Sequence, residues 1–410
     1  MSIQVIDGGV TAPKGYKAFG LRAGIKAGKT NKDMAMVYSE QPATVAGTFT
    51  LNVVKAAPVL WDKKIVEEQE TAQAIVVNSG IANACTGDVG YENAKTMAEE
   101  TGKLLGLSPE AVIVASTGVI GKQLDMDIIN NGIKAFAGKL LDTREGAVLA
   151  AEAIMTTDTH KKEIAVETVI GGKTVTIGAM CKGSGMIHPN MGTMLGFITS
   201  DVAISKDLLV QALKANVKDT FNMVSVDGDT STNDTVVIFA NGMAENAVIT
   251  EENEDYHTFC EALNTVNTYL AKQIAGDGEG ATRLLEAMVV NAPDKETAVT
   301  LSKAIITSNL TKAAVFGKDA NWGRILCAMG YSGAQFDPYK VDITIKSANG
   351  EAMLVQNGMA TDYDEAYATE ILSPEQVNIL ADIKSGDATA TAWGCDLTYD
   401  YVKINADYRS

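Results

Sequence analysis

Residues 182–201 organise this chain and read KGSGMIHPNMGTMLGFITSD. Glycine, proline and asparagine are frequent in the first half of this stretch, which predicts a backbone that turns several times. The alternating apolar run that begins at Met194 predicts a buried strand. Thr193 therefore stands at the start of a strand, directly after Gly192.

The Gly192-Thr193 pair has the chemistry that a self-cleaving main chain needs. Glycine leaves the carbonyl carbon of Gly192 unhindered, and the hydroxyl of Thr193 is able to attack it. After the cut, Thr193 would carry a hydroxyl nucleophile and a free α-amine, a combination that needs no histidine. The alternative is an ordinary turn, which is the far more common use of a glycine at a strand start.

The composition is that of an ordinary globular protein with an excess of acidic residues. The chain has 410 residues, of which 46% are hydrophobic and 21% are charged. This length favours two or three domains and leaves a single large α/β unit open. The formal net charge of -17 disfavours nucleic acid or an anionic membrane as the main partner. We find neither a secretory signal nor a run of ~20 apolar residues, so we expect a cytoplasmic protein.

The sequence does not indicate a metal or a bound cofactor. The five cysteines are scattered without a CxxC pair, and the three histidines lie outside any HExxH motif. Residues 225–235 resemble the first half of a calcium loop, but the glutamate that completes such a loop is missing. Residues 276–283 contain GxGxG rather than GxGxxG and precede a strand, which is a poor fit to a dinucleotide site.

A second candidate site follows the apolar run of residues 112–116. Thr117 and Gly118 stand at the end of this predicted strand, and ligands gather at the carboxyl ends of strands in open α/β sheets. A threonine hydroxyl beside a glycine N–H would supply two donors to a developing oxyanion. The alternative is a turn in which Gly118 supplies a positive φ angle. Residues 78–87 form a predicted loop of small polar residues, either a ligand-facing loop or a plain strand-to-helix connection.

Helical and strand patterns are mixed along the whole chain. Residues 91–105 follow helical spacing and Gly106 stops this helix, whereas residues 164–177 predict a hairpin that turns at Gly171 and Gly172. Residues 317–324 read as a loop of mixed charge. The chain shows no internal repeat and no low-complexity tract, so domain boundaries are weakly marked.

Several separate segments together resemble the ornithine acetyltransferase family, the self-cleaving glutamate N-acetyltransferases of arginine biosynthesis. The similarity covers nearly the whole chain, and its most specific motif is residues 182–195. It favours the catalytic interpretation of Thr193 and Thr117 over that of a turn. The segments are residues 78–87, 116–121, 155–159, 182–195, 226–234, 317–324 and 393–400.

The resemblance implies an α/β (α+β) fold and a processed chain. It places a layered αββα-type sandwich, the catalytic core, in residues 1–290. A smaller C-terminal α/β domain follows in residues 291–410, and its tail closes the substrate pocket. Cleavage between Gly192 and Thr193 would give an α segment and a β segment, and two of each would form a heterotetramer.

The activity that the resemblance implies is movement of an acetyl group from N2-acetylornithine to glutamate. Thr193 would be the nucleophile, its α-amine the general base, and the Thr117 hydroxyl and Gly118 N–H the oxyanion donors. No cofactor is implied, and acetyl-CoA stays open as a co-substrate. The implied substrate contacts are Thr156, Lys182, Thr193, Glu279, Asn405 and Ser410.

The charges of two of these contacts suit the implied substrates. Lys182 is a partner for a carboxylate and Glu279 for the ornithine ammonium. The alternative for both residues is solvated surface charge. Three positions depart from the family pattern: His188 replaces a small residue, Gly192 replaces an alanine and Ile81 replaces an asparagine. We interpret His188 as a turn residue rather than an additional base.

Two other functions stay open on the sequence. A self-processing threonine amidase or aminopeptidase would use the same nucleophile with water as the acceptor. An unprocessed structural or binding protein would show neither cleavage nor turnover. Transfer of the acetyl group to glutamate rather than to water distinguishes the acetyltransferase from the first alternative. An N-terminus at Thr193 in the mature chain distinguishes it from the second.

Overall fold

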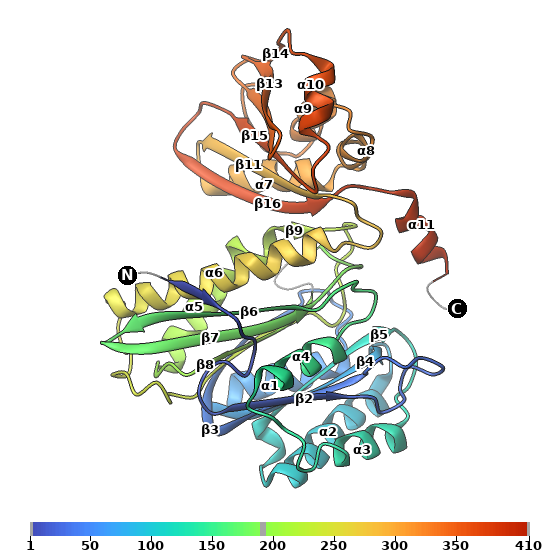
Figure 1. Ribbon diagram of the computed structural model, residues 1–410, viewed down its shortest axis with the longest axis vertical. Helices are drawn as coiled ribbons and strands as arrows, with labels where there is room; N and C mark the ends of the chain where they lie inside the picture. The colour runs from blue at the N-terminus through green and yellow to red at the C-terminus, as the bar shows by residue number, and fades with distance from the viewer. Residues whose placement is uncertain (1–2, 189–193, 408–410) are drawn as a thin grey trace. The chain divides into compact units, whose positions relative to one another are not determined.

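The computed structural model describes residues 3–188 and 194–407. The chain divides into two compact units, each with its own sheet (Figure 1). The first unit consists of Met1–Gly183, Pro189–Asn222 and Thr230–Leu270, and the second of Ser184–His188, Met223–Asp229 and Ala271–Ser410. The functional boundary that we expect at residue 290 stays a prediction.

The first unit is built on a mixed nine-stranded sheet. Its strand order is β1-β6-β7-β8-β10-β3-β4-β5, and β2 pairs with β3. The strands are β1 (Gln4–Ile6), β2 (Tyr16–Leu21), β3 (Met34–Phe49), β4 (Thr71–Ile81), β5 (Val112–Val119), β6 (Lys162–Ile170), β7 (Lys173–Lys182), β8 (Leu195–Ser200) and β10 (Thr235–Ala240).

The long strand β3 joins two arms of this sheet. Its first part pairs with β2 and β4, and its last part pairs with β10. The register with β4 shifts between Tyr38 and Ala43, and such an irregularity bends a strand. The arm with β6, β7 and β8 and the arm with β2 and β3 consequently form two layers (Figure 1). The predicted α/β class and layered core are confirmed, with hydrogen bonds joining the two layers into one continuous sheet.

Helices cover both outer faces of the layered sheet. In Figure 1, α5 and the first-unit part of α6 lie over β6 to β8, and α2 and α3 lie on the opposite side. One buried apolar cluster includes Ile75 of β4, Met97 of α2 and Val114 of β5. The helices are α1 (Ala57–Glu68), α2 (Gly87–Leu105), α3 (Met126–Lys134), α4 (Arg144–Ala153), α5 (Lys206–Asp219) and α6 (Glu254–Gly276).

The second unit contains a seven-stranded sheet in the order β14-β13-β12-β15-β11-β16-β9. Helix α7 packs against β11 and β16, and α10 packs against β12 and β13. The strands are β9 (Val224–Ser225), β11 (Leu284–Ala292), β12 (Asp342–Ser347), β13 (Gly350–Gln356), β14 (Met359–Ala360), β15 (Gln376–Asp382) and β16 (Ala388–Cys395). The helices are α7 (Lys295–Thr307), α8 (Asn309–Gly317), α9 (Trp322–Gly330), α10 (Glu365–Ile371) and α11 (Tyr399–Ala406).

The structure confirms some of the local sequence predictions and corrects others. The hairpin that turns at Gly171 and Gly172 is confirmed, and α2 ends before Gly106, which has a φ of 71°. The predicted loop at residues 78–87 is wrong at its start, because β4 continues to Ile81. The predicted loop at residues 317–324 is shorter, since α8 ends at Gly317 and α9 begins at Trp322.

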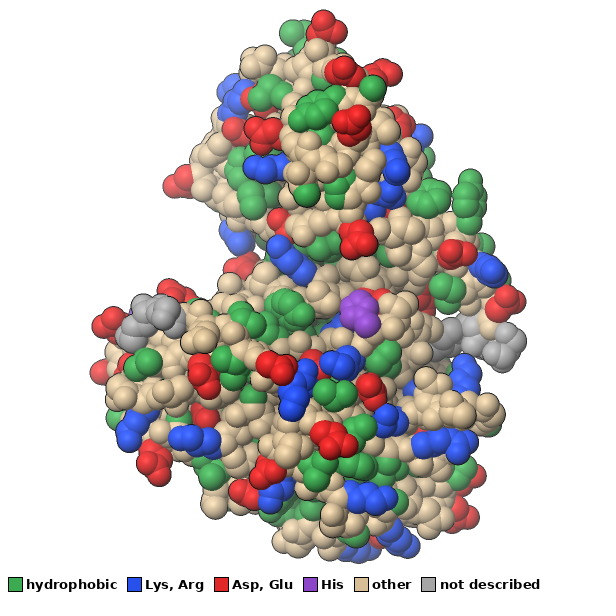
Figure 2. All heavy atoms as spheres, in the orientation of Figure 1, with side chains coloured by type: hydrophobic (Ala, Val, Ile, Leu, Met, Phe, Trp, Pro, Cys, Tyr) green, Lys and Arg blue, Asp and Glu red, His purple; other side chains and the backbone are tan. Residues whose placement is uncertain are grey.

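The surface carries both signs of charge. On the face drawn in Figure 2, acidic and basic side chains are interspersed over both units rather than gathered by sign. Among the described residues, no helix combines the length and the apolar character that crossing a membrane requires.

Candidate active site

Thr117 and Gly118 lie at the carboxyl end of β5, as the sequence predicts. Strand β5 runs parallel to β4, and Gly118 is the register partner of Gly80. Gly118 has a φ of +129°, and a Cβ at this position would lie 2.2 Å from the carbonyl carbon of Gly80. Both the backbone conformation and the close approach of the strands therefore require glycine here.

Two asparagine side chains fix the backbone directly before Thr117. The Oδ1 atom of Asn78 accepts a hydrogen bond of 2.6 Å from Ser116 Oγ. The Nδ2 atom of Asn233 donates to the carbonyl oxygens of Ser116, at 2.8 Å, and of Ala82, at 2.6 Å. The sequence places both asparagines in motifs but does not indicate that they meet at this strand end.

Asp158 connects two of the predicted substrate contacts. Its Oδ2 atom accepts from the Thr156 N–H at 3.0 Å, and its Oδ1 atom accepts from the Gly183 N–H at 2.7 Å. The same Oδ1 accepts from Lys162 Nζ at 2.8 Å, and both side chains of this ion pair are fully buried. Asp158 thus ties Thr156 to the residue that follows Lys182.

Positive charge determines the protonation state of Asp158. Burial alone would raise the pKa of this carboxyl, but the charges of Lys182 and Lys162 outweigh burial. Hydrogen bonds from Lys162 and from the Thr156 N–H add to this effect, so the pKa lies well below its ordinary value. Asp158 is consequently a carboxylate at any physiological pH.

The predicted nucleophile and cleavage site lie outside the described residues. These are Gly192 and Thr193, and the predicted contact Ser410 lies outside them as well. On either side of residues 189–193, the sheet holds the chain through the antiparallel pair of β7 and β8. Lys182 is the register partner of Leu195, which follows Thr193 by two positions.

Glu279 and Asn405 meet within the second unit. Asn405 Nδ2 of α11 donates to Glu279 Oε2 at 2.8 Å, and Glu279 is buried. The Glu279 N–H donates to the Ser184 carbonyl at 2.9 Å. A Cβ on Gly185 would lie 2.3 Å from Glu279 Cδ, so the glycine makes room for the carboxylate.

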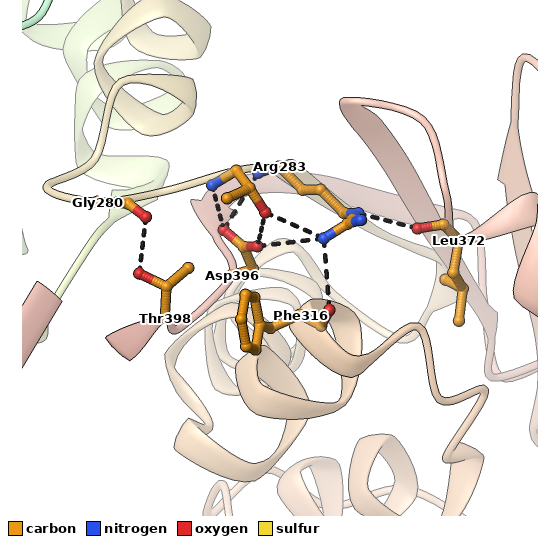
Figure 3. Close-up of polar contacts among 7 residues, drawn as sticks. Gly280, Arg283, Phe316, Leu372, Asp396 and Thr398 are labelled. Carbon is orange, nitrogen blue, oxygen red and sulfur yellow. Dashed lines mark hydrogen bonds and ion pairs between the residues drawn. The ribbon is translucent and has the colours of Figure 1, made fainter. Parts of the chain in front are cut away.

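Asp396 is the centre of the polar contacts that hold the loop after Glu279 (Figure 3). Its Oδ1 atom accepts from the backbone N–H groups of Thr282, at 2.8 Å, and Arg283, at 3.1 Å. The Arg283 side chain reaches Asp396 Oδ2 at 3.5 Å and donates through Nε to the Leu372 carbonyl at 2.9 Å. The carboxylate therefore fixes both the backbone and the cation of this loop.

Thr398 adds a contact at the start of α11. Its hydroxyl donates to the Gly280 carbonyl at 2.7 Å (Figure 3). The same hydroxyl accepts from the Tyr401 N–H at 3.4 Å. The first contact holds the residue after Glu279, and the second caps the helix that carries Asn405. One threonine thus links the loop that follows Glu279 to the helix that carries Asn405.

The departures from the family pattern occupy different surroundings. His188 lies in the second unit with Nδ1 at 3.0 Å from Ser225 Oγ. Burial and the charge of Lys303 together lower the pKa of His188 to about 4, against the opposing charge of Asp227. The ring is therefore neutral at pH 7. Ile81 is buried in the apolar cluster of the first unit.

The match to known proteins extends over nearly the whole chain. A family model described as the ArgJ family matches residues 17–410. The chain belongs to the ArgJ family. The match includes the strand end at Thr117, the ion pair of Asp158 and the loop that carries Glu279.

Individual ArgJ relatives are similar over all or nearly all of their length. The arginine biosynthesis bifunctional protein ArgJ of Caldanaerobacter subterraneus is 50% identical over 408 residues, which is 100% of both chains. The corresponding ArgJ 1 of Clostridium acetobutylicum is 54% identical over 396 residues, 96% of each chain. A crystal structure of ornithine acetyltransferase complexed with ornithine from Mycobacterium tuberculosis is 39% identical. It covers 46% of this chain and 99% of its own, with a TM-score of 0.43.

Proposed function

We propose that this protein is the acyltransferase of arginine biosynthesis that moves the acetyl group of N2-acetylornithine to glutamate. Membership of the ArgJ family over residues 17–410 is the observation that carries the proposal. The two ArgJ relatives named above are arginine biosynthesis proteins that match 96% or more of this chain. The proposed location is the cytoplasm, and the proposed assembly is a heterotetramer of two α and two β segments.

The proposed chemistry begins with self-cleavage. The hydroxyl of Thr193 attacks the carbonyl carbon of Gly192, the C–N bond breaks and the freed amine takes a proton. Water then hydrolyses the resulting ester and releases the carboxylate of Gly192. Thr193 becomes an N-terminal residue with a hydroxyl nucleophile and an amine base.

Acetyl transfer follows in two half-reactions. The Thr193 amine takes the hydroxyl proton as the oxygen attacks the acetyl carbonyl, and the Thr117 hydroxyl and Gly118 N–H stabilise the oxyanion. Ornithine leaves with the proton from the Thr193 amine, and an acetyl ester remains on Thr193. The amine of glutamate attacks this ester and passes a proton to the Thr193 amine. The bond between Thr193 Oγ and the acetyl carbon breaks, Oγ takes that proton and N-acetylglutamate leaves, so the kinetics are ping-pong.

The proposed contacts bind groups of opposite charge on the substrate. Lys182 binds a carboxylate, Glu279 binds the ornithine ammonium, and Thr156, Asn405 and Ser410 add hydrogen bonds. The rigid supports of Lys182 and Thr156 around Asp158 favour this assignment. No cofactor is proposed, and acetyl-CoA is a proposed second donor because the relatives are named bifunctional.

The test follows a labelled acetyl group. Purified protein with acetyl-labelled N2-acetylornithine and glutamate is expected to yield labelled N-acetylglutamate, and N-terminal sequencing is expected to find a chain that begins at Thr193. The variant Thr193→Ala should remain one uncut, inactive chain. Release of the label only as free acetate would reject the transferase and favour the amidase. A full-length chain without turnover would reject both enzymes.

A further inference from the structure

A lysine outside every proposed contact lies among the candidate site residues of the first unit. Lys26 belongs to the connection between β2 and β3, and its loop is organised by Asp33, whose carboxylate is fully buried. This carboxylate accepts hydrogen bonds from the backbone N–H groups of Ala23 at 2.6 Å, Gly24 at 3.1 Å and Lys26 at 3.2 Å. Three bonds to one side chain fix the backbone from which Lys26 projects.

The Lys26 side chain reaches two of the proposed site segments. Its Nζ atom donates to the carbonyl oxygen of Met155, the residue before Thr156, at 2.7 Å. Its Cγ atom lies 3.1 Å from the position that a Cβ on Gly80 would occupy, so its stem passes over Gly80. Since Gly80 is the register partner of Gly118, the stem lies beside the strand end that carries the proposed oxyanion donors.

The charges around Lys26 favour an anionic ligand. The pKa of Lys26 is lowered to about 8, mainly by burial and also by the charges of Lys182 and Lys29, whereas Asp33 and Asp158 oppose the shift. Lys26 and Lys182 thus act on each other as like charges in a partly buried place. A carboxylate that contacts both would relieve their repulsion and raise the charged fraction of Lys26.

Two of the protein's own carboxylates near these lysines, those of Asp158 and Asp33, are already engaged in hydrogen bonds. Asp158 accepts from Lys162 Nζ and from two backbone N–H groups, and Asp33 accepts from three backbone N–H groups. An ammonium has three N–H donors, and Lys26 Nζ directs two bonds to carbonyl oxygens, those of Met155 and, at 3.2 Å, Lys32. Among the contacts between described residues, one donor of Lys26 Nζ remains for an oxygen of a ligand.

We propose that Lys26 is a further substrate-binding residue, which together with Lys182 binds the carboxylate of the acylated amino acid. The inference rests on the proposed function and deepens it. Lys26 makes no bond to the reacting atoms in this assignment. It distinguishes substrates that carry an α-carboxylate from acetylated amines that lack one.

The experiment compares two acetyl donors that differ only in the carboxylate. N2-acetylornithine carries it, and N-acetylputrescine is the same molecule without it. For Lys26→Met we expect the KM for N2-acetylornithine to rise about 10- to 100-fold with kcat changed less than about 3-fold, the range of one hydrogen bond to a charged group. With N-acetylputrescine, kcat/KM should change less than about 3-fold by the same argument.

Two variants provide the controls. Lys26→Arg keeps the charge and should recover most of the affinity for N2-acetylornithine. Lys29→Met removes an exposed lysine from the same loop and should leave both donors unaffected. Thermal unfolding of each variant separates a loss of binding from a loss of folding.

The outcomes distinguish this inference from the function on which it rests. If wild-type protein transfers acetyl groups but Lys26→Met keeps the wild-type KM, the inference is overturned and the function stands. The inference also fails if Lys26→Met weakens both donors equally, because Lys26 would then only hold the Met155 carbonyl. Absence of transfer by the wild-type protein overturns both.

Discussion

Gly118 and Glu279 are both candidate site residues, but different parts of the structure hold them. Gly118 is fixed by the register of two parallel strands that a Cβ would force apart, and Asp158, in the same unit, is fixed by a fully buried ion pair. Glu279 lies on a loop and receives Asn405 from α11, an exposed residue near the chain end. At these positions the first unit relies on strand register and a fully buried ion pair, and the second on a contact from an exposed side chain. We therefore expect substitutions at these sites to lower stability or activity more in the first unit than in the second.

The largest effect is expected from Asp158→Asn. It leaves Lys162 as a buried cation without its carboxylate, which costs about 3–5 kcal/mol in the free energy of unfolding. Urea denaturation measures this loss. Glu152→Gln breaks the partly exposed pair with Lys32 and should cost no more than about 1 kcal/mol. Equal losses in both variants would contradict the importance of the buried pair.

The same residue predicts a pH dependence. Because the folded pKa of Asp158 lies below its unfolded value of about 3.9, its carboxylate stabilises the fold fully above pH ~4. This contribution is lost as the pH falls further toward the folded pKa. Wild-type protein should therefore lose stability more steeply below pH ~4 than Asp158→Asn, and parallel curves would argue against the assignment.

The next largest effect concerns the strand end itself. Thr117→Ala removes one of the two proposed oxyanion donors and should lower kcat by about 10²–10³-fold. The thermal midpoint should hardly change, since the backbone there is fixed by Asn78 and Asn233 through Ser116. The exposed Thr369 of α10 provides a control in Thr369→Ala. A wild-type kcat in Thr117→Ala would remove this residue from the site.

A smaller effect is expected in the second unit from Asp396→Asn. Arg283 loses its charged partner, and a hydrogen bond between charged groups contributes about 1.5–3 kcal/mol. Chemical denaturation gives the total, and amide hydrogen exchange at residues 279–283 shows whether the loosening is local. Glu351→Gln, in an exposed pair with Lys346, should stay within about 1 kcal/mol. If Asp396→Asn lowered the free energy of unfolding as much as Asp158→Asn, the proposed difference between the two units would be wrong.

The smallest effect is expected from Thr398→Ala. It removes the cap of α11 and the bond to Gly280, and loss of such a cap costs about 1 kcal/mol. Because α11 carries Asn405, the KM for N2-acetylornithine should rise while kcat is kept. Thr398→Ser keeps the hydroxyl and should behave as the wild-type protein. An unchanged KM in Thr398→Ala would separate α11 from substrate binding.

The sequence predicts those features that depend on neighbouring residues. The hairpin of β6 and β7 follows from the Gly171-Gly172 turn, and the end of α2 follows from Gly106. The continuation of β4 to Ile81 was not predictable in this way. Its polar residue Asn78 is buried because it bonds to Ser116, a residue 38 positions away.

The same limit applies to the candidate site. Thr117, Gly118 and Lys182 stand in local motifs with recognisable chemistry, so the sequence alone marks them. Lys26 stands in no such motif. What connects it to the candidate site is a hydrogen bond from its Nζ atom to the carbonyl oxygen of Met155, 129 positions away. Long-range contacts of this kind are invisible in a pattern of residue types, since either partner alone resembles an ordinary surface residue.

The strand order bears on whether the chain folds before or after the proposed cleavage. A cut between Gly192 and Thr193 would place β1 to β7 on one polypeptide and β8 and β10 on the other. In the sheet, however, β8 and β10 lie between β7 and β3. The first polypeptide alone would present two unpaired strand edges, at β7 and at β3, which invite aggregation. The chain would therefore have to fold before such a cut, and its two products would stay hydrogen-bonded to each other within one sheet.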